Sequence, residues 1–158
     1  MSSNVIAIIP ARGGSKGIPR ENLLVLGGKP VIEHSIECAR HTSSISRIVV
    51  STDDPDIGDC ARKTGAEVIW RPAELCGDTA TSESALVHAR DCLETTESYI
   101  PDLVIFIQPT SPCRQPHDIE KAIAQLHREN ADWLFTACPV PGFVWRRTAD
   151  DLTPVSYE

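Results

Sequence analysis

The chain has 158 residues, a length that suits one globular domain, and 41% of them are apolar while 23% are charged. Its formal net charge of −7 argues against a nucleic-acid-binding surface, because phosphate backbones are held by clustered Lys and Arg. The sequence has no uncharged apolar run of the roughly 18 residues that a membrane-spanning helix needs.

The opening residues and the cysteines indicate a cytoplasmic protein. The sequence starts MSSNVIAIIP, which lacks both the basic segment and the long apolar segment of a secretion signal. The six cysteines form no C-x-x-C pair, and Cys60 and Cys92 fall on the apolar stripes of expected helices. We therefore expect unpaired, structural cysteines and the cytoplasm as the compartment.

Apolar runs of strand length alternate with helical patterns along the chain. Val5–Ile9 is an unbroken apolar run, typical of a strand that is buried on both faces. A basic, glycine-containing loop follows it, and the next helix is expected over residues 30–41, with Pro30 at its first position. Residues 47–54, RIVVSTDD, predict the second strand.

The helix after this strand has the clearest boundary signals. Asp54 is a suitable N-cap, Pro55 fits the first turn, and Gly65 fits a left-handed ending.

The rest of the chain repeats the alternation of strands and helices. We expect, in order, a strand at 67–72, a polar loop at 72–82, a helix with Ala85, Leu86, Ala89, Cys92 and Leu93 on one face, a strand at 102–108, a helix at 116–130 and a strand at 132–140. Residues 141–158 show no clear period. This order predicts an α/β fold, an open and mainly parallel sheet with helices on both faces, in a single domain over residues 1–158.

The loop after the first strand has the composition of a phosphate-binding loop. Gly13, Gly14 and Gly17 let backbone N–H groups come close to a phosphate. Arg12 and Lys16 would add charge-assisted hydrogen bonds. The loop matches neither G-x-x-x-x-G-K-[ST] nor G-x-G-x-x-G, and a solvated surface loop is the alternative interpretation.

The loops after the other strands carry further candidates, because ligands bind at the carboxyl ends of the strands in open parallel sheets. Asp53 is a possible magnesium ligand, whereas Asp54 is better explained as a helix cap. Arg71 is either an outward-facing strand-end charge or a base contact. The Gln108 amide either faces the site or satisfies a turn. The five histidines fall mostly on expected helices, and we assign none of them a catalytic role.

Five segments between residues 6 and 140 together resemble one family. They are IIPARGGSKGIP, STDD, RPAEL followed by DTATS, QPTSPCR and TACPV, in the family's order. By these motifs the chain is similar to the acylneuraminate cytidylyltransferases, also called CMP-sialic acid or CMP-nonulosonate synthetases. The resemblance implies a Rossmann-like nucleotide-diphospho-sugar transferase fold. It also implies transfer of CMP from CTP to a nine-carbon 2-keto sugar acid, sialic, legionaminic or similar, with release of pyrophosphate and with Mg²⁺ as cofactor.

The resemblance also implies roles for individual residues. Arg12 and Lys16 would hold the triphosphate as catalytic residues. The implied substrate-binding residues are Ala11, Gly13, Asn22, Arg71, Ser82, Gln108, Thr110 and Ser111. Among them, Asn22, Arg71 and Ser82 would recognise cytidine, whereas the amide of the QPTSP segment would face the sugar acid.

The chain departs from the family pattern at two places. Glu21 stands where the family usually has Lys, and the neighbouring Arg20 is the candidate to compensate for its charge. Family members continue past Glu158 through a segment that supplies an Asp-x-Asp pair for magnesium and most of a homodimer interface. No D-x-D follows Asp118 here, so the sequence assigns no metal ligands. We expect this chain to correspond to the family's N-terminal, nucleotide-binding portion.

Two other functions are open at this point. A catalytically incompetent CTP-binding module would keep the triphosphate loop and the cytidine pocket without the metal carboxylates. An NAD-dependent oxidoreductase would need G-x-G-x-x-G, which is absent.

Overall fold

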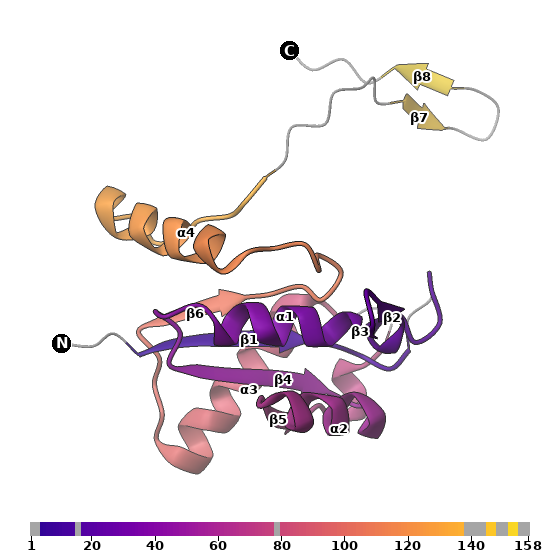
Figure 1. Ribbon diagram of the computed structural model, residues 1–158, viewed down its shortest axis with the longest axis horizontal. Coiled ribbons are helices and arrows are strands. Elements are labelled where there is room, and N and C mark those ends of the chain that lie inside the picture. The colour runs from indigo at the N-terminus through magenta and orange to yellow at the C-terminus, as the bar shows by residue number, and fades with distance from the viewer. Residues whose placement is uncertain (1–3, 15–16, 78–79, 138–144, 148–151, 155–158) are drawn as a thin grey trace.

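The centre of the protein is a four-stranded parallel sheet (Figure 1). The structure, a computed structural model, describes residues 4–14, 17–77, 80–137, 145–147 and 152–154. The strands of the sheet are β1 (Val5–Pro10), β4 (Arg47–Thr52), β5 (Glu67–Trp70) and β6 (Leu103–Phe106), in the order β5-β4-β1-β6. All three pairings are parallel, so the carboxyl ends of the strands meet at one edge.

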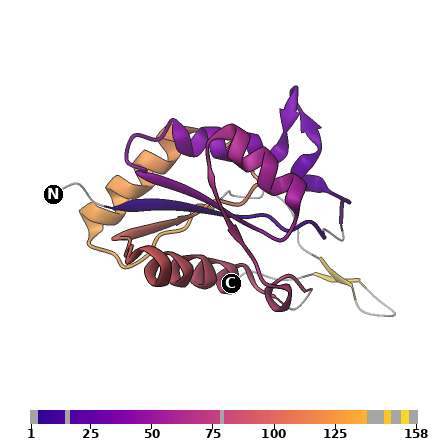
Figure 2. The same ribbon diagram turned by 90° about the horizontal axis from the view of Figure 1, so that it is seen from below.

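Helices cover both faces of this sheet, as predicted (Figure 2). They are α1 (Val31–Arg40), α2 (Pro55–Thr64), α3 (Ser82–Glu97) and α4 (Pro116–Glu129). One core cluster joins Ala7 and Ile9 of β1 to α1, α2 and α4. The other joins Ile6 and Ile8 to α3. Successive residues of β1 thus face opposite layers, which is why this strand is apolar at every position.

The boundary signals of α2 are confirmed. The side chain of Asp54 accepts hydrogen bonds from the N–H groups of Asp56 and Ile57, and Pro55 is the first residue of the helix. Gly65 ends the helix with a φ of 95°, in the left-handed region. The prediction for α1 was wrong by one position, because Pro30 has an extended ψ of 144° and precedes the helix as its N-cap.

The predicted fifth strand is wrong for residues 132–137, and residues 138–140 lie outside the described residues. The described part of this segment pairs with no strand, and the rings of Trp133 and Phe135 stack on each other while remaining 72% and 70% exposed. A strand forms only where its backbone N–H and C=O groups can hydrogen-bond to a neighbouring strand, and the pattern of side chains does not show whether such a strand is present.

Short pairings that the sequence analysis did not predict occur outside the main sheet. β2 (Val25–Leu26) pairs with β3 (Lys29–Pro30), and β7 (Trp145–Arg147) pairs with β8 (Leu152–Pro154), both antiparallel. Two or three residues are too few to show a period of two.

Among the helices of the described residues, none combines the length and the apolar composition needed to cross a membrane. The five cysteines described, namely Cys38, Cys60, Cys76, Cys92 and Cys113, form no disulfide with one another, whereas Cys138 lies outside the described residues.

Candidate active site

A cleft of about 240 Å³ lies at the carboxyl edge of the sheet. It is built from the loops after β1, β5 and β6 and from the start of α3, as expected for an open parallel sheet. The residues that line it are Pro10, Arg12, Glu21, Asn22, Arg71, Ala80, Thr81, Ser82, Phe106, Gln108, Pro109 and Thr110.

The structure brings together six of the ten residues that the sequence analysis assigned to the site. Arg12, Asn22, Arg71, Ser82, Gln108 and Thr110 all line the cleft. Ala11, Gly13 and Ser111 do not line it, and their contacts are those of supporting residues. Lys16 lies outside the described residues.

The start of the first loop is held by β4. The Ala11 N–H donates to the carbonyl oxygen of Ser51 at 2.9 Å, and the Gly13 N–H donates to Oδ1 of Asp53, also at 2.9 Å. We expected the Gly13 N–H to face a phosphate, but in this structure it is used within the protein. Ala11 itself is buried, so it anchors the start of the loop in the core and does not line the cleft.

The two arginines of the cleft are held mainly by neutral acceptors. Arg71 donates through Nη2 to the Ser51 carbonyl oxygen at 2.7 Å and through Nε to Ser51 Oγ at 3.3 Å. Arg12 donates through Nη1 to the Gly77 carbonyl oxygen at 3.3 Å. Burial lowers the pKa of Arg71, and the nearby charge of Arg12 lowers it further, while Cys76 and Asp53 oppose this shift. A cleft lined by two guanidinium groups favours a ligand with negatively charged or acceptor oxygens.

Asn22 is a buried polar residue beside Arg12. It belongs to the short 3-10 helix Glu21–Leu23, and its Nδ2 donates to the carbonyl oxygen of Arg12 at 3.2 Å. Only 5% of Asn22 is exposed, so its amide is fixed in place.

Glu21 also lines the cleft, and the neighbouring Arg20 does not offset its charge there. Arg20 instead donates through Nη2 to Oδ2 of Asp56 at 2.6 Å. Arg20 is absent from the residues that line the cleft, so the compensation that the sequence suggested is wrong.

The start of α3 forms one wall of the cleft. Thr81 is the N-cap, and its Oγ1 accepts a hydrogen bond from the Ser84 N–H at 3.2 Å. Ser82 is the first residue of the helix, where the partial positive charge of the helix end favours a negative ligand. Sequence reasoning missed Thr81, although a Thr before an apolar stripe, followed by an acidic residue in the first turn (Glu83), is an N-cap signal.

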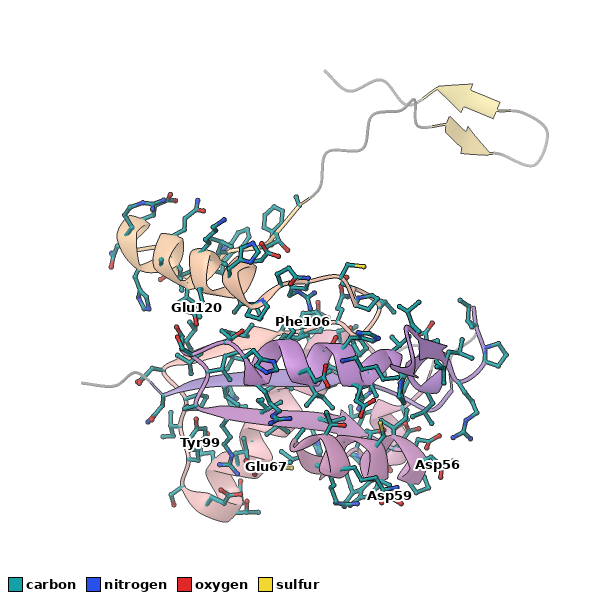
Figure 3. The ribbon with its side chains drawn as sticks, in the orientation of Figure 1. Asp56, Asp59, Glu67, Tyr99, Phe106 and Glu120 are labelled. Carbon is teal, nitrogen blue, oxygen red and sulfur yellow. The ribbon has the colours of Figure 1, made fainter. Side chains whose placement is uncertain are left out.

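The loop after β6 presents an amide and a hydroxyl to the cleft. The Ser111 N–H donates to the carbonyl oxygen of Gln108 at 3.2 Å, which closes a turn. Gln108 and Thr110 are exposed and line the cleft, whereas Ser111 contributes its backbone to the turn. Phe106, missed by the sequence analysis, is the last residue of β6 and 38% exposed (Figure 3).

The described residues hold no ready-made metal centre. In the part of the chain that the structure describes, no three His, Cys, Asp or Glu side chains are grouped so that they could hold a metal ion. Asp53, the candidate ligand, already accepts the Gly13 N–H through Oδ1.

Comparison with known proteins identifies the family. The family model described as cytidylyltransferase matches residues 6–153, nearly the whole chain. The chain belongs to the cytidylyltransferase family. It is 38% identical over 139 residues to the CMP-N,N'-diacetyllegionaminic acid synthase of Legionella pneumophila, covering 86% of this chain and 58% of that protein.

Two further relatives have related names. The chain is 37% identical over 123 residues to the N-acylneuraminate cytidylyltransferase of Escherichia coli, covering 78% of this chain and 28% of that protein. It is 36% identical over 133 residues to the pseudaminic acid cytidylyltransferase of Campylobacter jejuni, covering 84% and 57%. The chain thus spans less than two thirds of the length of each of these relatives.

Solved structures agree with this assignment. A CMP:2-keto-3-deoxy-manno-octonic acid synthetase complexed with CTP is 28% identical, with a TM-score of 0.68 over 82% of this chain and 49% of that one. A 4-diphosphocytidyl-2C-methyl-D-erythritol synthase is 17% identical, with a TM-score of 0.72 over 99% of this chain and 70% of that one, and this likeness shows the shared fold alone.

Proposed function

We propose that this chain is the nucleotide-binding part of a CMP–nonulosonate synthetase, which transfers CMP from CTP to a nine-carbon 2-keto sugar acid and releases pyrophosphate. The observation that carries the proposal is the pair of guanidinium groups, Arg12 and Arg71, in one cleft at the carboxyl edge of the sheet. The names of the three relatives support the nine-carbon class, because they refer to legionaminic, N-acylneuraminic and pseudaminic acids.

In this reaction the main tasks of the protein are to position the two substrates and to neutralise negative charge. The anomeric hydroxyl oxygen of the sugar acid attacks the α-phosphorus of CTP and loses its proton to solvent, while the bond from that phosphorus to the bridging oxygen breaks and pyrophosphate leaves. Negative charge accumulates on the phosphate oxygens during this step. Arg12 would stabilise it from the cleft, and we propose the same role for Lys16.

The remaining residues of the cleft would hold the two substrates. We assign cytidine recognition to Asn22, Arg71 and Ser82, which lie after β1, after β5 and at the start of α3, and which all line one cleft. The Gln108 amide and the Thr110 hydroxyl, in the loop after β6, would contact the sugar acid.

Magnesium is the cofactor that we propose for the reaction, because it neutralises the charge of a nucleoside triphosphate. The described residues do not fit a dedicated metal site, since no three candidate ligands are grouped among them. We assign no protein ligand to the ion.

The compartment and the assembly are also proposals. The cytoplasm suits a chain whose five described cysteines are free, because thiols stay reduced there. A homodimer is what the family resemblance implies, and sedimentation velocity would test it.

The test of the proposed function is release of pyrophosphate by this chain, in the presence of CTP, Mg²⁺ and a panel of nine-carbon keto sugar acids. We expect release that requires both CTP and one of the acids. If CTP stabilises the chain against thermal unfolding but no pyrophosphate is released, the function is nucleotide binding alone. If CTP neither stabilises the chain nor yields pyrophosphate, the proposal is wrong.

A further inference from the structure

The segment at the end of β4 clamps the backbone on both sides of Arg12. β1 and β4 pair in register up to Pro10 and Ser51, and the Ala11 N–H continues this pairing by donating to the Ser51 carbonyl oxygen at 2.9 Å. One residue beyond Arg12, the Gly13 N–H donates to Oδ1 of Asp53 at 2.9 Å. A side chain thus takes over the pairing at the point where the strands end.

The close approach of the loop to this segment requires glycine at position 13. A Cβ placed on Gly13 would lie 2.6 Å from Oδ2 of Asp54. Asp54 cannot easily move away, because its other oxygen caps α2 by accepting from the N–H groups of Asp56 and Ile57 at 2.8 and 3.2 Å. The loop therefore rests against a fixed helix end, with Asp53 as its hydrogen-bond acceptor.

Asp53 also acts electrostatically on the second arginine of the cleft, Arg71, without lining the cleft itself. Its negative charge opposes the lowering of the Arg71 pKa that burial causes. Burial and then the same carboxylate raise the pKa of the Cys76 thiol. Asp53 is therefore an exposed residue that contacts the loop after β1 and acts electrostatically on residues of the loop after β5, while it is not among the residues that line the cleft.

We propose that Asp53 is a positioning residue for the transfer of CMP. By accepting the Gly13 N–H, its side chain fixes the backbone that follows Arg12 and so directs the guanidinium group at the phosphates. This inference rests on the proposed function. It needs an acceptor oxygen at position 53, and it does not need a negative charge there.

This requirement separates positioning from direct binding of magnesium by Asp53. Asp53→Asn keeps an oxygen that can accept the Gly13 N–H and removes the carboxylate charge that Mg²⁺ prefers in its protein ligands. Asp53→Ala removes both. Asp59→Ala is the matched control, because Asp59 is an exposed carboxylate on α2 that pairs with Arg62 at 3.3 Å, outside the cleft (Figure 3).

The experiment measures kcat, the KM for CTP and the Mg²⁺ dependence of pyrophosphate release for the unsubstituted chain and the three variants. Exchange of the Gly13 amide hydrogen is followed by NMR in the same samples. We expect Asp53→Ala to lower kcat by about tenfold or more, because small misplacements of a catalytic group are costly. Its KM for CTP should change by less than about threefold, and its Gly13 amide should exchange faster. Asp53→Asn and Asp59→Ala should stay close to the unsubstituted chain in all these measurements.

Other results would overturn the proposal. A loss of activity in Asp53→Asn equal to that in Asp53→Ala, with a raised Mg²⁺ requirement, would make Asp53 a metal ligand instead. An unchanged kcat in Asp53→Ala, or unchanged exchange at Gly13, would remove the positioning role. Absence of turnover in the unsubstituted chain would count against the proposed function, while the exchange measurement would still test the contact itself.

Discussion

The two arginines of the cleft at the carboxyl edge of the sheet and Arg47 at the amino edge have different kinds of partner. At the carboxyl edge, Arg71 is held by the carbonyl and hydroxyl oxygens of Ser51, and Arg12 by the carbonyl oxygen of Gly77, so neutral acceptors position both guanidinium groups. At the amino edge, Arg47 donates to both carboxylate oxygens of Glu67, at 2.7 and 2.5 Å.

Arg47 has two more partners at this edge. It pairs with Glu97 at 2.8 Å and lies over the ring of Tyr99, 4.8 Å from its centroid. Glu67 of β5 and Tyr99, which follows α3, are both labelled in Figure 3, and both contact Arg47. An arginine that is paired with carboxylates has its positive charge neutralised within the protein. An arginine that is held by neutral acceptors keeps a positive charge that an anionic ligand can neutralise.

The largest expected effect is on nucleotide binding at the carboxyl edge. Arg12→Ala should weaken CTP binding by about 10- to 150-fold, because a hydrogen bond between charged groups contributes about 1.5–3 kcal/mol. Isothermal titration calorimetry with CTP measures this change. Arg128→Ala, which removes an exposed arginine of α4, is the control and should bind CTP normally. Equal affinities for both variants would show that Arg12 does not contact the nucleotide.

The amino edge should respond in stability instead of binding. Arg47→Ala should lower the free energy of unfolding by about 1–2 kcal/mol, a value that allows for the half-exposed positions of both its carboxylate partners. Urea denaturation measures the loss, and CTP affinity should be unchanged. A weakened affinity at temperatures where the variant is folded would break the contrast between the two edges.

Glu21 offers a way to sharpen the contrast within the cleft. Glu21→Lys replaces a negative charge by a positive one beside the proposed triphosphate site and should tighten CTP binding by about fivefold, the equivalent of about 1 kcal/mol at a solvated position. Glu129→Lys makes the same charge change at the end of α4, outside the cleft, and should leave the affinity unaltered. If the two variants bind CTP alike, residue 21 does not face the nucleotide.

The smallest effect concerns pH. Hydrogen bonding to Arg47 lowers the pKa of Glu97 in the folded protein. A lowered carboxyl pKa contributes stability that is present above the unfolded value of about 4.3 and is lost as the pH falls through the folded value. The stability difference between the unsubstituted chain and Arg47→Ala should therefore be constant from about pH 6 to 8 and shrink below about pH 4. A difference that stays constant down to pH 3 would contradict a role for the Glu97 charge.

Much of the scaffold was predictable because its signals are local. The apolar run Val5–Ile9 and the cap residues Asp54 and Gly65 describe single elements, and the structure confirms them. The fifth strand was not predictable in this way. Residues 132–137 have a strand-like sequence, but a strand forms only where a neighbouring edge accepts its backbone groups.

The candidate site also has a part that the sequence predicts and a part that only the tertiary structure determines. The order of strands and helices determined by itself that the loops carrying Arg12, Asn22, Arg71, Ser82 and Gln108 would meet, because the carboxyl ends of parallel strands share one edge. Tertiary structure alone decided which groups in those loops face the cleft. It turned the Gly13 N–H toward Asp53, placed Arg20 on Asp56 and brought Phe106 into the lining. These outcomes depend on contacts between residues about 30 to 40 positions apart or more, and no periodicity or local motif encodes such contacts.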